Sequence, residues 1–183
     1  MPSNDSKKCN SFEINCLKKE WSFMVSLLFL FLISCTNQVD ESKKNKLPDD
    51  SNLEILLDVW HLAAAKADSA SYFDFISTEG RFLGTDASEN WSKEEFLNFS
   101  APYFQKGKAW TFTGYDRNWY YSTDSSVAWF DERLNTWMGE CRGSGVMIMD
   151  EDNPKLAHYN LTVTIANDKI QDFIALTNTS EIQ

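Results

Sequence analysis

The sequence predicts an α+β domain with helices in its first half and a mainly antiparallel sheet in its second. Up to residue 107 the apolar residues recur at helical spacing, and from Ala109 onward they alternate with a period of two. Short clusters of turn-forming residues separate the alternating segments, which favours hairpins between neighbouring strands. Helices followed by a meander of strands are typical of α+β domains. A strongly curved sheet packed on helices leaves a space that side chains fill only partly, so we expect a pocket there.

Three helices are predicted from apolar spacing and from capping residues. Ser51 opens the first helix, with a glutamate three residues later that completes a capping box. Asp68 caps a second, shorter helix, and Gly80 ends it. Ser92 opens the third helix with another capping box, and Gly107 ends it. All three helices present large apolar side chains on one face.

Alternating segments predict the strands, and turn-forming residues separate them. The turns are expected at residues 122–125 and 150–154 and at the pair Asn167-Asp168. The predicted strands are residues 81–85, 109–115, 117–121, 126–134, 139–149, 156–165 and 170–177. No internal repeat interrupts this order, which favours a single domain over residues 51–183.

The composition supports a folded core and argues against nucleic-acid binding. Hydrophobic residues are 43% and aromatic residues 14% of the 183 residues, which is enough for one domain with a substantial core. The formal net charge is -10, and no stripe of lysines and arginines offsets it. Such a surface repels phosphate backbones and anionic lipid headgroups, so we expect no nucleic-acid partner. A membrane would have to be reached through a lipid.

Residues 1–34 are predicted to form a lipoprotein signal peptide. Lys18 and Lys19 precede an uncharged, mostly apolar run at residues 21–34, which is short for a bilayer span of about 20 residues. The run ends in Leu32-Ile33-Ser34-Cys35, which resembles a lipobox. The alternative is an uncleaved anchor or a buried helix, but the polar residues after Cys35 do not continue the apolar run.

Cys35 is therefore expected to carry a lipid as the first residue of the mature protein. Residues 35–50 then read as a flexible polar tether that Pro48 closes. These features predict a protein anchored by its lipid in the bacterial cell envelope, on the periplasmic or the outer-membrane side. The membrane is thus an expected partner.

The cysteines and histidines indicate neither a disulfide nor a metal site. Two of the four cysteines fall in the signal peptide and Cys35 is the lipid site, so Cys141 alone belongs to the folded part. We expect Cys141 to act as a small apolar residue. The chain has two histidines, His61 and His158, too few to complete a metal-thiolate site with one cysteine. No metal or organic cofactor is indicated.

Several short strings together resemble the SnoaL-like branch of the nuclear transport factor 2-like superfamily. The resemblance covers residues 53–176 and rests on these strings: residues 82–86 (FLGTD) with Trp91, 93–96 (KEEF), 106–110 (KGKAW), 127–132 (VAWFDE), 140–146 (ECRGSGV) and 159–161 (YNL). It implies a cone-shaped half-barrel with a cavity between the sheet and three N-terminal helices, and a possible homodimer through the outer sheet face. The superfamily includes ketosteroid isomerases, polyketide cyclases, dehydratases and binding modules. The isomerases' catalytic set, an aspartate base with a tyrosine and a protonated acid, has no match in this chain.

Alternation along residues 127–134 groups Trp129 with Asp131, and we assign that face to the interior. A carboxylate beside an indole in a poorly solvated pocket would have a raised pKa and could act as a general base. The alternative role for Asp131 is an ion pair with Arg142, since buried acids are usually paired. Both roles are compatible.

Three further residues of the strands are candidates for the pocket. Arg142 lies among glycines and could clamp a carboxylate or phosphate ligand, or it could serve the architecture of the sheet. His158 and Asn160 share one face of their strand, which lines the pocket or faces water. His158 could shuttle protons, or it could be a hydrogen-bonded residue of the sheet. His61 borders the apolar stripe of the first helix, where core packing explains it best.

Aromatic residues are the remaining candidates for ligand contact. Trp110 and Tyr121 are predicted to line the pocket together with Trp129, since a flat or apolar ligand needs indole and phenol surfaces. Packing in the core or at an interface is the alternative for each.

Two functions fit these residues. The first is an envelope-anchored binding module for a small, partly apolar molecule or for another protein. The second is an isomerase, cyclase or hydratase in which Asp131 abstracts a proton while Arg142, His158 or a tyrosine stabilises the oxyanion. The second requires those side chains to converge around an open cavity.

Overall fold

The structure is a computed structural model, and it describes residues 46–178. The predicted signal peptide (residues 1–34), the lipid site Cys35 and the tether up to residue 45 lie outside the described residues. Leu47, near the end of the predicted tether, is buried in the core, and its amide donates to the Ser125 carbonyl at 2.9 Å. Packing of the domain therefore begins at Leu47, ahead of Ser51.

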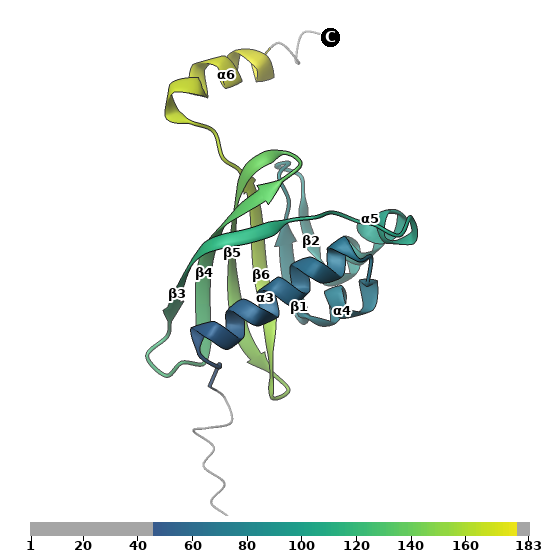
Figure 1. Cartoon of the computed structure of the whole chain (residues 1–183), viewed down its shortest axis with the longest axis vertical. Helices are drawn as coiled ribbons and strands as arrows, with labels where there is room; N and C mark the ends of the chain where they lie inside the picture. The colour runs from purple at the N-terminus through teal and green to yellow at the C-terminus, as the bar shows by residue number, and fades with distance from the viewer. Residues whose placement is uncertain (1–45, 179–183) are drawn as a thin grey trace, which may run out of the picture. The chain divides into compact units, whose positions relative to one another are not determined.

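Three helices precede the long strands, as predicted (Figure 1). Helix α3 spans Asp50–Ala65, α4 spans Ser69–Asp74 and α5 spans Lys93–Gln105. The predicted caps Asp68 and Ser92 are confirmed, and the capping box of α5 is complete. Asp49 rather than Ser51 caps α3, because its carboxylate accepts the amide of Asn52 at 3.2 Å. Within residues 46–178, no helix has both the length and the hydropathy that a bilayer crossing requires.

The second helix is shorter than predicted. It ends at Asp74, and strand β1 (Ile76–Leu83) begins almost at once, so Gly80 lies inside a strand. A Cβ on Gly80 would lie 2.9 Å from the carbonyl oxygen of Ser77 and 3.2 Å from that of Leu156 on the neighbouring strand. Close pairing of β1 in the sheet therefore overrides the helical spacing of the aromatic residues before it.

The strands form one curved sheet in the order β2-β1-β6-β5-β4-β3 (Figure 1). The other strands are β2 (Asn90–Ser92), β3 (Thr113–Tyr121), β4 (Val127–Thr136), β5 (Gly139–Asp150) and β6 (Asn153–Val163). β1 and β6 pair in parallel, and the remaining pairings in this sheet are antiparallel. The predicted cone-shaped, mainly antiparallel sheet packed on three helices is confirmed.

Strand β3 replaces the two strands predicted at residues 109–115 and 117–121. Its register with β4 shifts between Tyr115 and Asn118, and Asp116 has a φ of 50°. This irregularity turns the Arg117 side chain inward, where it is 6% exposed. The break that alternation placed at residue 116 is therefore a bulge within one strand.

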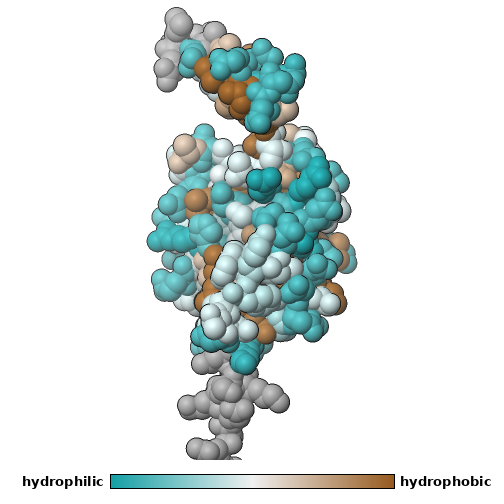
Figure 2. All heavy atoms as spheres, turned by 90° about the vertical axis from the view of Figure 1, so that its left-hand side faces the viewer, coloured by the Kyte–Doolittle hydropathy of each residue, from teal (hydrophilic) through white to brown (hydrophobic). Residues whose placement is uncertain are grey.

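The prediction of a strand at residues 170–177 is wrong. The chain there forms a short 3-10 helix, η1 (Asn167–Lys169), followed by helix α6 (Ile170–Asn178). Ile170, Phe173 and Ile174 share the three- and four-residue spacing of a helix, and their side chains are exposed. Figure 2 shows apolar side chains gathered on one side of this helix. The helical spacing of these apolar residues therefore describes the segment better than the partial alternation from which the strand was predicted.

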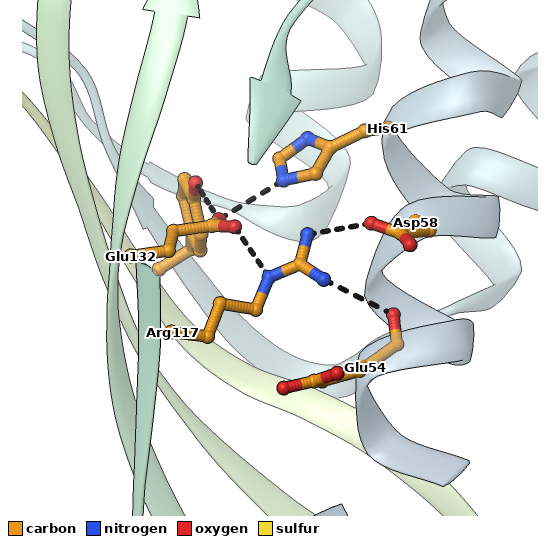
Figure 3. Close-up of polar contacts among 6 residues, drawn as sticks. Glu54, Asp58, His61, Arg117 and Glu132 are labelled. Carbon is orange, nitrogen blue, oxygen red and sulfur yellow. Dashed lines mark hydrogen bonds and ion pairs between the residues drawn. The ribbon is translucent and has the colours of Figure 1, made fainter. Parts of the chain in front are cut away.

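The buried carboxylate of Glu132 joins the helical layer to the sheet (Figure 3). His61 of α3 lies 2.9 Å from Glu132 Oε1, and the Tyr159 hydroxyl of β6 donates to the same oxygen at 2.8 Å. Arg117 Nε of β3 donates to Oε2 at 2.8 Å. An ionised carboxylate only accepts hydrogen bonds, so His61 Nε2 must carry the proton. Side chains from three neighbouring elements thus converge on one acid.

Arg117 extends the cluster back to α3. Its Nη2 lies 2.8 Å from Asp58 Oδ1, and its Nη1 donates to the Glu54 carbonyl oxygen at 3.2 Å (Figure 3). The guanidinium therefore bridges the fully buried Glu132 and the exposed Asp58. A charge this deep is tolerated only when it is paired and hydrogen-bonded.

The electrostatics of the cluster keep Glu132 ionised. Burial alone would raise the pKa of its carboxyl, but the hydrogen bond and charge of His61 and the charge of Arg117 outweigh burial, so the pKa lies below its ordinary value. Burial and the charge of Glu132 raise the pKa of the Tyr159 hydroxyl well above its ordinary value. Tyr159 therefore remains a hydrogen-bond donor.

We expect Gly143→Ala to destabilise the domain by about 1–3 kcal/mol. A Cβ on Gly143 of β5 would run into the Tyr159 hydroxyl and lie 2.9 Å from Glu132 Oε1, so the cluster would have to move. Urea unfolding followed by circular dichroism measures the change. Ser144→Ala, on the outer face of the same strand, is the matched control and should change stability by less than about 0.5 kcal/mol. Equal stability of the two variants would contradict this account.

We expect Glu132→Gln to lower the free energy of unfolding by about 3 kcal/mol near neutral pH, because it removes the buried partner charge of Arg117 and leaves the exposed Asp58 as the remaining one. Asp131→Asn, the adjacent acid on the outer face, should cost less than about 0.5 kcal/mol. Urea unfolding of both variants compares the two positions.

The cost of Glu132→Gln should shrink in acid. Because the pKa of Glu132 is lower in the folded than in the unfolded chain, its charge stabilises the fold above the unfolded pKa. That stabilisation is lost as the pH falls through the folded pKa. A difference between wild type and variant that stays the same from neutral pH to about pH 3 would refute the assignment.

Candidate ligand-binding pocket

A pocket of about 200 Å³ opens between α5 and the sheet, near the end where β6 finishes. Elements far apart in the chain build it: the end of β1, the loop after it, β2, α5, the segment before β3, the turn between β4 and β5, and β6. Its lining residues are Phe82, Gly84, Thr85, Glu89, Trp91, Phe96, Phe99, Tyr103, Ala109, Trp110, Phe112, Trp137 and Leu161. Eight of these thirteen side chains are aromatic, so the pocket presents ring surfaces to its contents.

Stacking within the wall fixes several of these rings. Trp91 lies on Phe99 with ring centroids 4.4 Å apart, and on Phe96 with an interplanar angle of 8°. Phe96 stacks in turn on Phe82 at 3.9 Å. Offset stacking of this kind is a preferred arrangement of aromatic side chains, so this wall is formed before a ligand arrives.

The mouth of the pocket is aromatic too. Phe99 and Tyr103 of α5 are 44% and 43% exposed, and Trp137 in the β4–β5 turn is 81% exposed. Isolated exposed apolar residues are ordinary, but these three border one cavity. A ligand would cover them, which provides apolar burial on binding.

Few polar groups line the pocket. Thr85 and Glu89 lie in the loop between β1 and β2, and Tyr103 contributes a phenol. Glu89 is half-buried, and its Oε2 accepts a hydrogen bond from the Asp86 amide at 3.1 Å. Among the residues that line the pocket, Glu89 and Tyr103 are the ionisable ones.

The Glu132 cluster is separate from this pocket. Phe112 lines the pocket and its ring centroid is 6.4 Å from that of His61, but neither His61 nor Glu132 is a lining residue. All three hydrogen bonds to Glu132 come from the protein itself. Glu132 is therefore placed to hold the fold together, and it does not contact a ligand in the pocket.

Trp129 and Asp131 lie on the outer face of the sheet, and the assignment of that face to the interior is wrong. Strand β4 buries Ala128, Phe130 and Glu132, whereas Trp129 is 45% exposed. Alternation grouped the residues correctly, but both faces of this strand carry an aromatic residue and an acid. The face with Glu132 is the buried one because Arg117 and His61 supply partners for its carboxylate in the interior.

Arg142, His158 and Asn160 also lie on the outer face. Strand pairing sets Asp131 beside Ser144, which in turn is beside Asn160, and it sets Trp129 beside Val146 and His158. Arg142 pairs with Arg133 at an exposed position, and neither forms an ion pair with Asp131 within residues 46–178. The expected convergence of Asp131, Arg142 and His158 around an open cavity is therefore absent.

Trp110 and Tyr121 have different positions. Trp110 lines the pocket as predicted. Tyr121 does not line the pocket. Its hydroxyl donates to Asp50 Oδ1 at 2.7 Å and so holds the start of α3. Burial and the neighbouring Asp50 raise the pKa of this hydroxyl well above its ordinary value. Tyr121 is thus a structural residue of the N-terminal end.

Sequence reasoning missed several residues of the pocket and of the cluster. Glu89, Trp137 and Leu161 were not singled out, and neither was Arg117. Trp137 follows the end of a predicted strand, where an exposed indole is unusual, and this signal could have marked it. His61 is buried as expected, but as a hydrogen-bonded group. The described residues contain no group of three or more His, Cys, Asp or Glu placed to hold a metal ion.

Comparison with known proteins identifies the family. A model of the SnoaL-like domain matches residues 53–166. No curated protein matches the chain significantly. The fold is similar to a nuclear transport factor 2-like protein from Cytophaga hutchinsonii ATCC 33406, with a TM-score of 0.54 and 13% identity over 64% of this chain and all (100%) of that chain.

Two further solved structures share the fold. One is a nuclear transport factor 2-like protein of unknown function from Pseudomonas putida KT2440, with a TM-score of 0.54, 9% identity, and coverage of 66% of this chain and 89% of that chain. The other is a domain of unknown function with a cystatin-like fold from Nostoc punctiforme PCC 73102, with a TM-score of 0.57, 12% identity, and coverage of 72% and 86%. With its matched family model, this chain belongs to the SnoaL-like domain family, and its curled sheet has the fold of nuclear transport factor 2-like proteins.

Proposed function

We propose that the domain is a binding module that holds a small, flat and largely apolar molecule in its aromatic pocket. The observation that carries the proposal is the lining itself, in which eight aromatic side chains surround a cavity with few polar groups. A ligand that inserts between such rings gains apolar burial and roughly 0.5–1.5 kcal/mol for each well-placed aromatic pair. The carboxylate of Glu89 and the hydroxyls of Thr85 and Tyr103 would orient the ligand in the pocket.

The size of the pocket limits the ligand. Its volume of about 200 Å³ is below the range of roughly 300–1,000 Å³ that is usual for drug-sized ligands. The expected occupant is therefore one or two rings in size. The open mouth between Phe99 and Trp137 leaves room for a substituent to extend outward.

Binding is a better account of this pocket than the catalytic arrangement considered from the sequence. A base and an oxyanion partner must both reach the reacting atoms. Asp131, Arg142 and His158 lie across the sheet from the interior, and Glu132 is enclosed by protein donors. The family includes enzymes, but the residues of this chain favour a pocket that holds its ligand.

We expect wild-type protein to bind 2-naphthol and indole, and Ala109→Phe to weaken both by at least about tenfold, or roughly 1.4 kcal/mol. The new ring would occupy the pocket without removing any wall residue, since Ala109 itself lines the cavity. Titration calorimetry measures the affinities, and thermal unfolding checks that the variant is folded.

Trp129→Ala, on the outer face of the sheet, is the control for that titration and should bind both probes like wild type. If neither probe binds wild type, the pocket is not a site for flat apolar ligands. If Trp129→Ala weakens binding and Ala109→Phe does not, the site lies on the outer face instead.

We further propose that the module works in the bacterial cell envelope, anchored by a lipid on Cys35. The support is the lipobox-like Leu32-Ile33-Ser34-Cys35 after an apolar run. The segment from Cys35 to the buried Leu47 would reach at most about 40 Å when extended, which would hold the pocket near the membrane.

Cys35→Ser should abolish incorporation of radiolabelled palmitate and leave the protein unprocessed or released from the membrane fraction. Cys141→Ser is the matched control and should be labelled like wild type, because Cys141 lies in the core and outside the lipobox. Equal labelling of wild type and Cys35→Ser would contradict the anchor.

A further inference from the structure

We propose that the ligand of the aromatic pocket is an organic cation, a quaternary or protonated amine with an apolar body, and that Glu89 is its counter-ion. This inference rests on the proposed binding function and specifies the chemistry of the ligand. It combines two observations: the charge of the lining and the faces of the rings.

The charge of the lining has one sign. Glu89 is the one charged residue among those that line the pocket, and no lysine, arginine or histidine lines it. The whole chain carries a formal net charge of -10. An anionic ligand would be repelled by Glu89 and by this field, whereas a cation would be attracted by both. A neutral ligand would leave the carboxylate without a partner charge.

The surroundings of Glu89 leave it available for a ligand. Its carboxylate lies against Gly84, where a Cβ would collide with it, so the glycine makes room for the acid inside the pocket wall. Oε2 accepts from the Asp86 amide, but within residues 46–178 no donor to Oε1 and no ion pair of Glu89 is found. This half-buried carboxylate can therefore accept the charge of a cationic ligand as its ion-pair partner.

The rings provide the second part of the site. Trp91 and Phe99 are stacked, Tyr103 is next to Phe99 with centroids 5.9 Å apart, and Trp137 borders the same opening. The face of an aromatic ring is electronegative and attracts a cation that lies within about 6 Å of its centroid. Aromatic cages of this kind recognise quaternary ammonium groups in many proteins, and here the lining includes a carboxylate as well.

The chain already places one of its own cations on this rim. Lys106 Nζ lies 5.7 Å from the centroid of the Tyr103 ring. Lys106 is exposed and is not a lining residue, so its charge acts from outside the pocket. It shows that this ring takes part in cation contacts. It also predicts that removing Lys106 will favour an incoming cation by relieving repulsion.

The test compares choline with 3,3-dimethylbutan-1-ol, its uncharged carbon isostere, by titration calorimetry at low ionic strength. Wild-type protein should bind choline at least about tenfold more tightly than the isostere. Glu89→Gln should remove most of that difference by weakening choline alone. Glu79→Gln, an exposed acid of β1 outside the pocket, makes the same change in net charge and should leave the difference intact.

Lys106→Gln provides an independent test that does not depend on the folding of Glu89→Gln. It should strengthen choline binding by about two- to threefold and leave the isostere unchanged. A fall in choline affinity in Lys106→Gln would count against the proposal.

The outcomes separate this inference from the proposed function. If 2-naphthol binds but choline does not bind, or binds no better than its isostere, the cation inference is overturned and the apolar pocket stands. If Glu89→Gln and Glu79→Gln weaken choline equally, the attraction is a property of the net charge, and the role of Glu89 is overturned. If choline, its isostere and 2-naphthol all fail to bind, both proposals fail.

Discussion

The domain depends on a single buried carboxylate. Glu132 receives hydrogen bonds from His61, Arg117 and Tyr159, so one side chain of β4 connects α3, β3 and β6. Removing an acid from water costs several kcal/mol, and only a complete set of donors and a partner charge offsets this. The cluster therefore fixes the position of α3 against the sheet. The aromatic pocket lies between α5 and the sheet, and none of its lining residues belongs to the cluster.

Much of the fold could be predicted from the sequence because its signals are local. Caps such as Asp68 and the Ser92 capping box mark helix starts, and period-two alternation marks β4, β5 and β6. The errors occur where distant contacts decide. Residues 76–80 lie in a strand because Ile76 and Arg81, on either side of an irregularity, both pair with β6, and no local pattern reports that parallel pairing. The sequence of α6 has the apolar spacing of a helix, but a partial alternation in the same residues led to the prediction of a strand.

The candidate site was predicted less well, for a reason visible in residues 127–132. Alternation divides this segment into two faces, and each holds an aromatic residue and an acid, so composition cannot say which face is buried. Arg117 decides it, and a bulge in β3 aims this side chain inward. Of the five residues predicted to contact a ligand, Trp110 lines the pocket. The others were assigned through the wrong face or, in the case of Tyr121, through the wrong end of the sheet.

The position of β6 has a consequence for how the chain folds during its synthesis. Of the strands within residues 46–178, β6 is the last to leave the ribosome, yet it lies between β1 and β5 in the finished sheet. Until residue 163 has emerged, β1 has no long partner and the β3–β4–β5 meander has an open edge. The half-barrel cannot close from its N-terminus onward while translation proceeds. For the export proposed above, such late closure would keep the nascent chain unfolded until β6 has been synthesised, which is the state that a protein-conducting channel requires.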